Sequence, residues 1–349
     1  MNDKVILVLG TRTDPHVDRV ARRLEERGCK DVVVIDYHAG TTFSLELDDR
    51  AHRVIKVDGR RLACDSTVWD KTKILPGTRY YIRGTEPEVG YAAQEWRAYY
   101  ALLTAFCGDG AVNTLRSRQC MVKPYQQTVA ASVGLRVPRT LVSNDKDALL
   151  AFAGECESMI MKSLSGAKVS TKGEGEEVPY VVMTMRVPER DVAAADPGHF
   201  EVCPHFAQEE IAKSHELRVV VAGSRIIPFR IDSQKFQSTQ VDWRKATGLN
   251  TFSRCEIDPG LEGQIAAFME AMGLTTGSLD FIVDKTGNNW FLECNQDGVW
   301  AWLDDLVDGE ITDAFADVLL QKLQTPPAGK LPHRGYIGCG RNGWSRERT

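Results

Sequence analysis

The sequence predicts a mixed α/β protein, with α/β and α+β segments, that contains more than one domain. Three observations support this. Strand and helix patterns alternate near the N-terminus, consecutive strands joined by short turns follow residue 206, and a length of 349 residues allows two or three domains with sizeable cores. We therefore expect an N-terminal βαβ domain, a central domain and a C-terminal domain with an antiparallel sheet.

The N-terminal third has the pattern of a βαβ unit. Residues 5–9 form a short apolar run typical of a buried strand, and residues 31–36 form a second one. Between them, Asp14 is placed to cap a helix with Pro15 at its first position, and the helix is expected to run to about Arg27. An amphipathic helix is expected over residues 91–106, with Trp96, Tyr99 and Leu103 on one side.

The middle of the chain alternates helices, a strand and a polar loop. A helix is expected over residues 118–133, stopped by Gly134, and Asp145 is placed to cap a second, shorter helix. Residues 159–162 form an apolar strand. Residues 163–177 are rich in Gly, Ser, Lys and Glu without periodicity, so we expect a loop, which either closes over a bound ligand or merely connects two elements.

The last third changes to strands. These are expected over residues 206–211, 216–222 and 225–231, with Gly223 and Ser224 as a two-residue hairpin turn. A helix over 259–272, a hairpin over 278–295 and a helix over 308–323 follow. Glycine and aspartate cluster at 108–113. We therefore place the domains at 1–112, 113–205 and 206–325, with a basic tail at 326–349.

Bulk composition excludes several classes of protein. A formal net charge of −5 argues against a general nucleic-acid binder and against binding to a membrane surface. No apolar run approaches the roughly twenty residues of a membrane span, and the N-terminus leads directly into a strand, so we expect a cytoplasmic protein. The nine cysteines include no Cys-x-x-Cys pair, which indicates neither a disulfide framework nor structural zinc.

The hairpin at 278–295 carries the strongest chemical signal. A turn centred between Thr286 and Gly287 places Asp280 directly across from Glu293, and Asn295 shares the face of Glu293. Like charges set opposite each other destabilise a sheet, whereas a divalent cation reverses that penalty. Oxygen ligands alone favour Mg²⁺, which usually also holds substrate phosphates. The alternative is two solvated acids on an exposed face.

Cations that could balance phosphates lie elsewhere in the chain. Lys123 falls within an expected helix and Lys162 ends an apolar strand, although a surface lysine would explain either one. No Walker loop is present. Residues 338–343 match a dinucleotide fingerprint in letters, but no βαβ unit surrounds them, so we discount that match.

Two further groups complete the candidate site. The strand that contains Gln208, Glu209, Glu210 and Ile211 could offer edge backbone groups to an adenine ring, and Glu216 could accept ribose hydroxyls. Solvated acids are the alternative for the carboxylates. Three arginines fall on or near strands expected to flank the hairpin and could stabilise charge on a transferring phosphoryl group, although structural ion pairs would also explain them; they are Arg218, Arg230 and Arg244.

In this combination and order, these residues resemble the ATP-grasp superfamily. The resemblance implies an ATP-grasp fold with a small N-terminal domain, a central lid domain and a C-terminal catalytic domain. It also implies ATP and Mg²⁺ as ligands. The lysines would hold phosphates, the strand at Gln208 would take adenine, Glu216 would bind ribose, and Mg²⁺ would be held by Asp280, Glu293 and Asn295.

Within that superfamily the chain is most similar to the graspetide ligases, which make microviridin-type products. The similar stretches are residues 95–98, 135–145, 231–234, 241–244 and 298–302. The resemblance implies an enzyme that joins acidic side chains of a ribosomal precursor peptide, bound through its leader, to hydroxyls or amines, and a possible homodimer. Two alternatives stay open: a ligase of the same fold that acts on free amino acids or a protein terminus, and a nucleotide-binding regulator without turnover.

Overall fold

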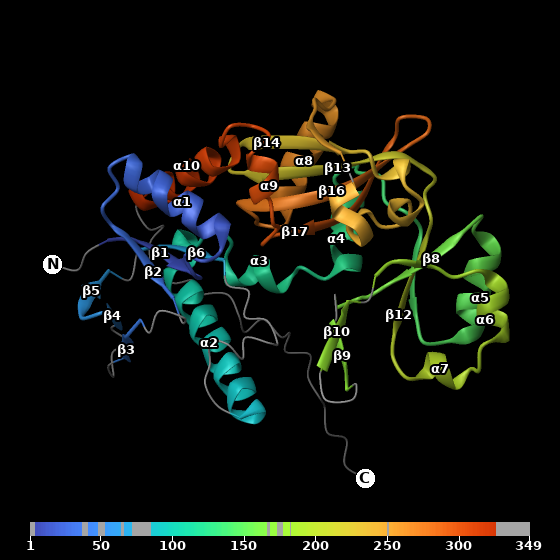
Figure 1. The fold of residues 1–349 in the computed structure, drawn as a ribbon, viewed down its shortest axis with the longest axis horizontal. Helices are drawn as coiled ribbons and strands as arrows, with labels where there is room; N and C mark the ends of the chain where they lie inside the picture. Colours follow the sequence, from blue (N-terminus) through green and yellow to red (C-terminus); the bar gives the residue numbers. More distant parts are fainter. Residues whose placement is uncertain are drawn as a thin grey trace, which may run out of the picture.

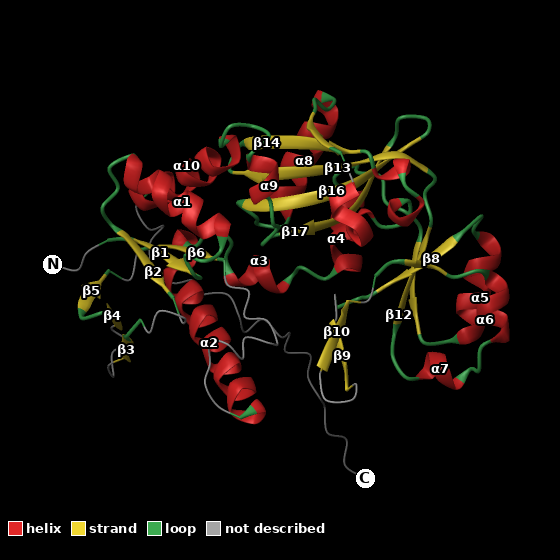
Figure 2. Cartoon of the chain, in the orientation of Figure 1, coloured by secondary structure: helices red, strands yellow, loops and turns green. Residues whose placement is uncertain are grey.

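The computed structural model describes residues 4–36, 41–47, 53–63, 66–71, 85–165, 168–172, 177–181, 183–249 and 251–325. The expected basic tail and the fingerprint-like segment at 338–343 lie outside these residues. Within the described ranges the strands form five sheets, and helices cover the larger ones (Figures 1 and 2). The α/β fold class is confirmed. In the same ranges, none of the helices combines the length and the apolar character that a membrane span requires.

The expected βαβ unit is present at the N-terminus. Helix α1 (Pro15–Glu26) begins after Asp14, whose carboxylate accepts the His16 N–H. It packs against a sheet of three parallel strands in the order β2, β1, β6. Their bounds are β1 (Ile6–Leu9), β2 (Val32–Ile35) and β6 (Thr67–Asp70).

A long helix, α2 (Glu86–Cys107), packs against this sheet through Tyr100 and Leu103, which are buried with Leu7 and Leu9 of β1. A small antiparallel sheet adds to the same core. It contains β3 (Phe43–Leu47), β4 (Arg53–Val57) and β5 (Arg60–Leu62), none of which the sequence pattern predicted.

The prediction of one continuous helix over 118–133 is wrong. The chain forms α3 (Leu115–Gln119), breaks, and restarts as α4 (Lys123–Ser132), which ends before Gly134 with φ at +88°. Proline at position 124 explains the break, because it lacks an N–H and its ring clashes with the preceding turn, so it is tolerated only in the first turn of a helix. Lys123 therefore lies at the start of α4 and not in the helix interior.

The central sheet has the order β11, β8, β12, β7. Its core is made by helices α5 and α6, with Leu149 and Val192 fully buried. The irregular loop expected over 163–177 is wrong in part, because a two-stranded hairpin of β9 and β10 occupies most of the described residues there. The bounds are β7 (Thr140–Ser143), α5 (Lys146–Glu155), β8 (Met159–Lys162), β9 (Lys168–Lys172), β10 (Glu177–Val181), β11 (Met185–Arg186), α6 (Glu189–Ala194), α7 (Gly198–Glu201) and β12 (His205–Glu209).

The C-terminal sheet is antiparallel, in the order β15, β14, β13, β16, β17. Helices α4 and α8 bury one face and α10 buries the other (Figure 1). The strands are β13 (Lys213–Ala222), β14 (Arg225–Ile231), β15 (Phe252–Arg254), β16 (Thr276–Asp284) and β17 (Asn289–Asn295). The remaining elements are η2 (Gly108–Gly110), η3 (Ser233–Lys235), η4 (Gln237–Thr239), η5 (Trp243–Leu249), α8 (Pro259–Ala271), α9 (Ala301–Asp304) and α10 (Glu310–Gln324).

Register in the β16–β17 hairpin is decisive for the site. Asp280 pairs with Glu293, as expected, but Phe281 pairs with Phe291, so Leu292 is an extra residue in a β-bulge. The turn is therefore centred on Thr286, half a residue from the expected point. The bulge restores the pairing of the two acids.

Candidate functional site

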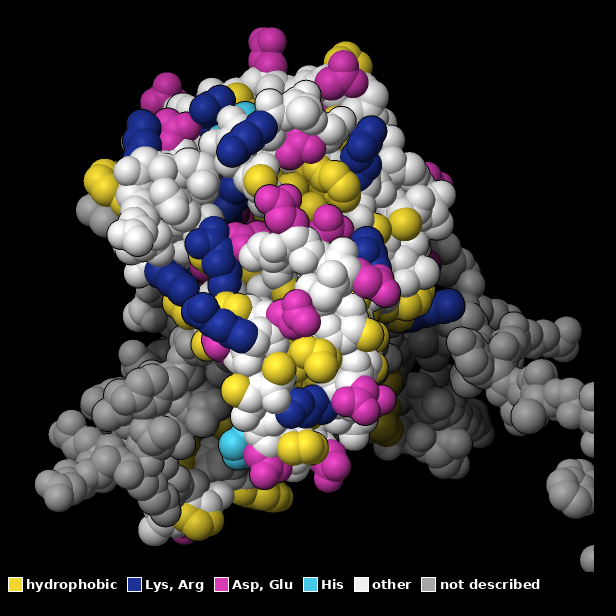
Figure 3. Space-filling model, turned by 90° about the vertical axis from the view of Figure 1, so that its right-hand side faces the viewer, with side chains coloured by type: hydrophobic (Ala, Val, Ile, Leu, Met, Phe, Trp, Pro, Cys, Tyr) yellow, Lys and Arg dark blue, Asp and Glu magenta, His cyan; other side chains and the backbone are white. Residues whose placement is uncertain are grey.

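A cleft of about 710 Å³, including space open to solvent, lies between the central sheet and the C-terminal sheet. The side of the molecule that carries the central domain shows Lys and Arg side chains gathered along one flank beside Asp and Glu side chains (Figure 3). Ten of the thirteen candidate residues line the cleft: Lys123, Lys162, Gln208, Glu209, Glu210, Ile211, Glu216, Arg244, Asp280 and Glu293.

The two facing carboxylates each have a cationic partner within the protein itself. Arg218 Nη1 lies 2.9 Å and 3.3 Å from the two oxygens of Asp280. Glu293 is 3.2 Å from Lys123 Nζ and 3.1 Å from Arg244 Nη1. A buried aspartate and a partly buried glutamate are thus held by cations from three different elements.

These environments shift the two carboxylates in opposite directions. Burial raises the pKa of Asp280, with Arg218 opposing and Glu293 adding to the rise. Burial also disfavours ionisation of Glu293, but Lys123 and Arg244 outweigh it and lower the pKa of that carboxyl. Glu293 is therefore the more firmly ionised member of the pair.

Both candidate lysines point into the cleft. Lys123 Nζ also donates to the Ser163 carbonyl at 3.2 Å, at the end of β8. Lys162 Nζ donates to Gln208 Oε1 at 2.7 Å, and burial lowers the pKa of this ammonium to about 8. An anion that enters the cleft would meet two ammonium groups that already interact with each other.

The expectation of an edge strand at Gln208 is wrong, because β12 lies inside the sheet between β8 and β7. The segment still reaches the cleft where it runs past the end of the strand. There the N–H groups of Glu209 and Glu210 donate to the carbonyls of Arg139 and Ser158, each at 2.9 Å. The side chain of Glu210 is occupied by Arg186 at 2.7 Å.

Glu216 is buried, lines the cleft and is paired with Lys213 at 2.7 Å. Sequence reasoning missed Lys213, which no local pattern marks. It also missed Asp242, which is buried and bonded to Arg244 at 2.9 Å. The i, i+2 spacing of Asp242 and Arg244 is a signal that could have been used.

The three arginines have different positions. Arg244 lines the cleft, and Arg218 lies behind Asp280 with its guanidinium 5.8 Å from the ring of Trp243. Arg230 does not join them. It pairs with Leu217 across the sheet, and side chains alternate along a strand, so Arg230 lies on the face opposite Arg218. Its partner there is Asp232 at 2.8 Å.

Asn295 ends β17 on the side of Glu293 but does not line the cleft; its amide oxygen accepts the Asp297 N–H at 3.0 Å. Within the described residues, no three Asp, Glu, His or Cys side chains converge as a preformed metal site. Two carboxylates and an amide oxygen nevertheless form the all-oxygen donor set that Mg²⁺ uses together with water and phosphate. The residues therefore fit Mg²⁺ chemically, provided that Lys123 and Arg244 turn from Glu293 to the incoming phosphates.

The two sheets with a cleft of lysines and carboxylates between them form an ATP-grasp fold. A solved ATP-grasp ligase from Chryseobacterium gregarium, associated with a ribosomally made and modified peptide and bound to ADP and to leader and core peptides, superposes with a TM-score of 0.79 at 24% identity, over 92% of this chain and 97% of that one. The macrocyclase MdnC from Microcystis aeruginosa, bound to precursor peptide MdnA, gives 0.75 at 24%, over 91% and 99%.

A more distant match is a RimK-domain ATP-grasp protein from Sphaerobacter thermophilus, with a TM-score of 0.52 at 17% identity over 90% of this chain and all of that one. No protein-family model matches the sequence, and no curated protein matches it. Identities below 25% establish a common fold.

Proposed function

We propose that this protein is an ATP-dependent, ADP-forming ligase that joins a carboxylate to a hydroxyl or an amine. The observation that carries the proposal is the convergence of Lys123, Lys162 and Glu293 in one cleft of an ATP-grasp fold, with Asp280 directly across from Glu293. Cations for phosphates and oxygen ligands for Mg²⁺ are what phosphoryl transfer requires.

ATP is proposed to bind with its adenine against residues 208–211 and its ribose near Glu216. Lys123 and Lys162 would balance phosphate charge, and Asp280, Glu293 and Asn295 would hold Mg²⁺. Bound Mg²⁺ supplies neutralisation and alignment of the β- and γ-phosphates. The backbone N–H groups of Glu209 and Glu210 already donate to carbonyl groups. The N–H of Ile211 has no partner among the described residues, so it is the best placed to donate to adenine.

The chemistry then follows in two balanced steps. An oxygen of the substrate carboxylate attacks the γ-phosphorus, the β–γ bridge breaks, and ADP leaves. A hydroxyl or amine attacks the resulting acyl phosphate, the new bond forms as phosphate departs, and phosphate takes up the proton. Arg218 and Arg244 would stabilise negative charge in these steps, because both lie at or next to the acidic pair.

The proposed substrate is a ribosomally made precursor peptide with a leader and acidic core residues. Support comes from the fold, since the Chryseobacterium structure contains a leader and a core peptide and the Microcystis structure contains a precursor peptide. The β9–β10 hairpin beside Ser163 is proposed to close over the nucleotide and exclude water from the acyl phosphate. We also propose cytoplasmic action, a possible homodimer and domain limits of 1–112, 113–205 and 206–325.

The test is incubation of the protein with ATP, Mg²⁺ and any peptide encoded beside its gene. Loss of one water mass per bond, matched by one ADP, is the expected result. ADP release with free amino acids or a protein terminus, and not with the peptide, would instead favour the other ligase. Nucleotide binding without ADP release for any of these carboxylates would favour a regulator.

A further inference from the structure

Residues 296–300, here named the post-β17 loop, connect the candidate site to the N-terminal domain. On the site side, the Asp297 N–H holds the amide oxygen of Asn295 at 3.0 Å. The Val299 carbonyl accepts from Arg218 Nη2 at 3.1 Å. The position of this loop therefore sets the orientation of one proposed Mg²⁺ ligand and of the arginine that holds Asp280.

The loop lies directly on the sheet and has little freedom to move toward it. A Cβ atom added at Gly298 would be 2.2 Å from Ser278 Oγ and 2.4 Å from Ser278 Cβ. Only glycine permits this approach. Movement away from the sheet is opposed by contacts on the other side of the loop.

Lys71, directly after β6, provides one such contact. Its side chain is 3% exposed, and its Nζ donates to the carbonyls of Asp297 and Gly298, each at 3.0 Å. Arg118 of α3 adds a bidentate pair to the Asp297 carboxylate at 3.2 Å and 3.0 Å. Charge-assisted and bidentate bonds of this kind are stronger than neutral ones and fix geometry.

His16 of α1 holds the far end of the loop. Its Nε2 accepts from the backbone N–H of Trp300 at 2.8 Å and of Ala301 at 3.1 Å. A nitrogen that accepts two N–H groups carries no proton, so the ring proton is on Nδ1 and is donated to Asp14 at 2.6 Å. Asp14 thereby fixes the tautomer that the loop requires.

We infer that Lys71, Arg118 and His16 act as positioning residues for the reaction, and we name them the loop clamp. This inference rests on the proposed function. The clamp holds the post-β17 loop so that Asn295 and Arg218 keep the geometry needed for acyl-phosphate formation. The N-terminal domain, through Lys71 and His16, and α3, through Arg118, thus contribute to catalysis without touching the substrate.

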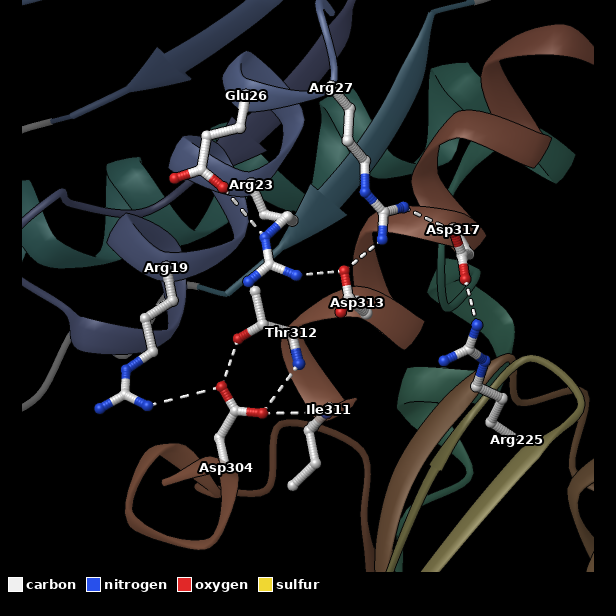
Figure 4. Close-up of polar contacts among 10 residues, drawn as sticks. All are labelled: Arg19, Arg23, Glu26, Arg27, Arg225, Asp304, Ile311, Thr312, Asp313 and Asp317. Atoms are coloured by element: carbon white, nitrogen blue, oxygen red, sulfur yellow. Dashed lines mark hydrogen bonds and ion pairs between the residues drawn. The ribbon is translucent and has the colours of Figure 1, made fainter. Parts of the chain in front are cut away.

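A separate set of ion pairs holds the N-terminal and C-terminal domains together. Arg23 of α1 and Arg27, directly after α1, pair with Asp313 of α10 (Figure 4). Arg27 also pairs with Asp317 at 2.6 Å, and Arg225 of β14 pairs with Asp317 at 2.7 Å. This network contacts no residue of the post-β17 loop. It offers a matched control, because removal of Arg27 also deletes a cation between the same two domains.

The experiment compares Lys71→Met with Arg27→Gln in the full chain. For Lys71→Met we expect kcat for peptide-dependent ADP formation to fall about tenfold or more, because misplaced groups slow the chemistry. The KM for ATP should stay within about twofold of the wild-type value, because the adenine contacts persist. Amide hydrogen exchange over 296–301 should accelerate about tenfold. Arg27→Gln should leave both readouts at the wild-type values. Arg118→Gln changes a partly exposed position and should give the same fall in kcat and the same faster exchange as Lys71→Met. It takes the place of Lys71→Met in the comparison if Lys71→Met does not fold.

Unchanged exchange over 296–301 in Lys71→Met and Arg118→Gln would overturn the clamp. Faster exchange with unaltered kcat, or equal effects from Arg27→Gln, would overturn its catalytic role. An inert wild-type protein would refute the proposed function and the role in catalysis, and the exchange comparison would still decide whether these residues hold the loop.

Discussion

Asp280 and Glu293 face each other across β16 and β17, but their charges are balanced from different directions. Arg218 on the adjacent strand β13 holds Asp280 at 2.9 Å, while Lys123 at the start of α4 holds Glu293 at 3.2 Å. Arg218 is buried and cannot follow a ligand, whereas Lys123 lines the cleft and can. Asp280 thus has a fixed partner, whereas Lys123 and Arg244, the partners of Glu293, both line the cleft and can exchange.

Glu293→Gln should slow ADP formation by about a hundredfold or more, because a carboxylate is replaced by a weaker, neutral ligand where phosphoryl transfer needs fixed charge. Steady-state assays with ATP, Mg²⁺ and peptide measure this. Glu262→Gln, on the exposed side of α8, is the control and should keep wild-type activity. Turnover that survives in Glu293→Gln would remove this residue from the proposed Mg²⁺ site.

Arg218→Met should destabilise the fold by about 3 to 5 kcal/mol, because it leaves the buried Asp280 without its cation. Adding Asp280→Asn should restore most of that loss, since the double variant no longer buries an unpaired charge. Denaturant unfolding of the wild type and of the three variants completes the cycle. If the two substitutions prove additive, the pair at 2.9 Å is not energetically coupled.

Nucleotide binding should weaken at alkaline pH because of Lys162. Its pKa of about 8 in the free protein means that the ammonium loses its proton above that pH, whereas bound phosphates favour the charged form. The Kd for ADP with Mg²⁺ should therefore be about tenfold higher at pH 9 than at pH 7. Calorimetry across this range measures it.

The control for this titration is Lys162→Arg, whose guanidinium stays charged throughout. The Kd of this variant for ADP should change little with pH, whatever its absolute value. If the Kd for ADP changed equally with pH in the wild type and in Lys162→Arg, the titration that affects binding would belong to another group.

The lowered pKa of Lys162 also affects the stability of the fold. Because the unfolded chain binds more protons between pH 8 and the ordinary lysine value near 10.5, the contribution of Lys162 to the free energy of unfolding should rise with pH across that window.

Much of the fold and site followed from local patterns. Alternation along the hairpin predicted that Asp280 and Glu293 meet, and the cap at Asp14 predicted the start of α1. The same alternation could have excluded Arg230. A two-residue turn at Gly223 pairs Ala222 with Arg225, and counting back puts Arg230 beside Leu217, away from Arg218.

The parts of the fold and site that the sequence did not predict depend on contacts between distant segments. Lys71 and the carbonyls it holds are 226 and 227 residues apart, and His16 is 284 residues from Trp300. Such pairs leave no periodic trace in the sequence. The internal position of β12 was hidden for a similar reason, because strand order in a sheet is set by tertiary packing and not by the strand itself.

Gly298→Ala tests how closely the post-β17 loop lies on β16. The new methyl group would meet Ser278 at 2.2 Å and 2.4 Å, so the loop must shift, at a cost of about 1 to 3 kcal/mol. Gly263→Ala is the matched control, because its Cβ would meet nothing within 4 Å and it lies inside helix α8. That substitution should instead stabilise the protein by up to about 1 kcal/mol. Thermal unfolding of the two variants should therefore give shifts of opposite sign, and a Gly298→Ala protein as stable as the wild type would mean that the loop is not confined at this point.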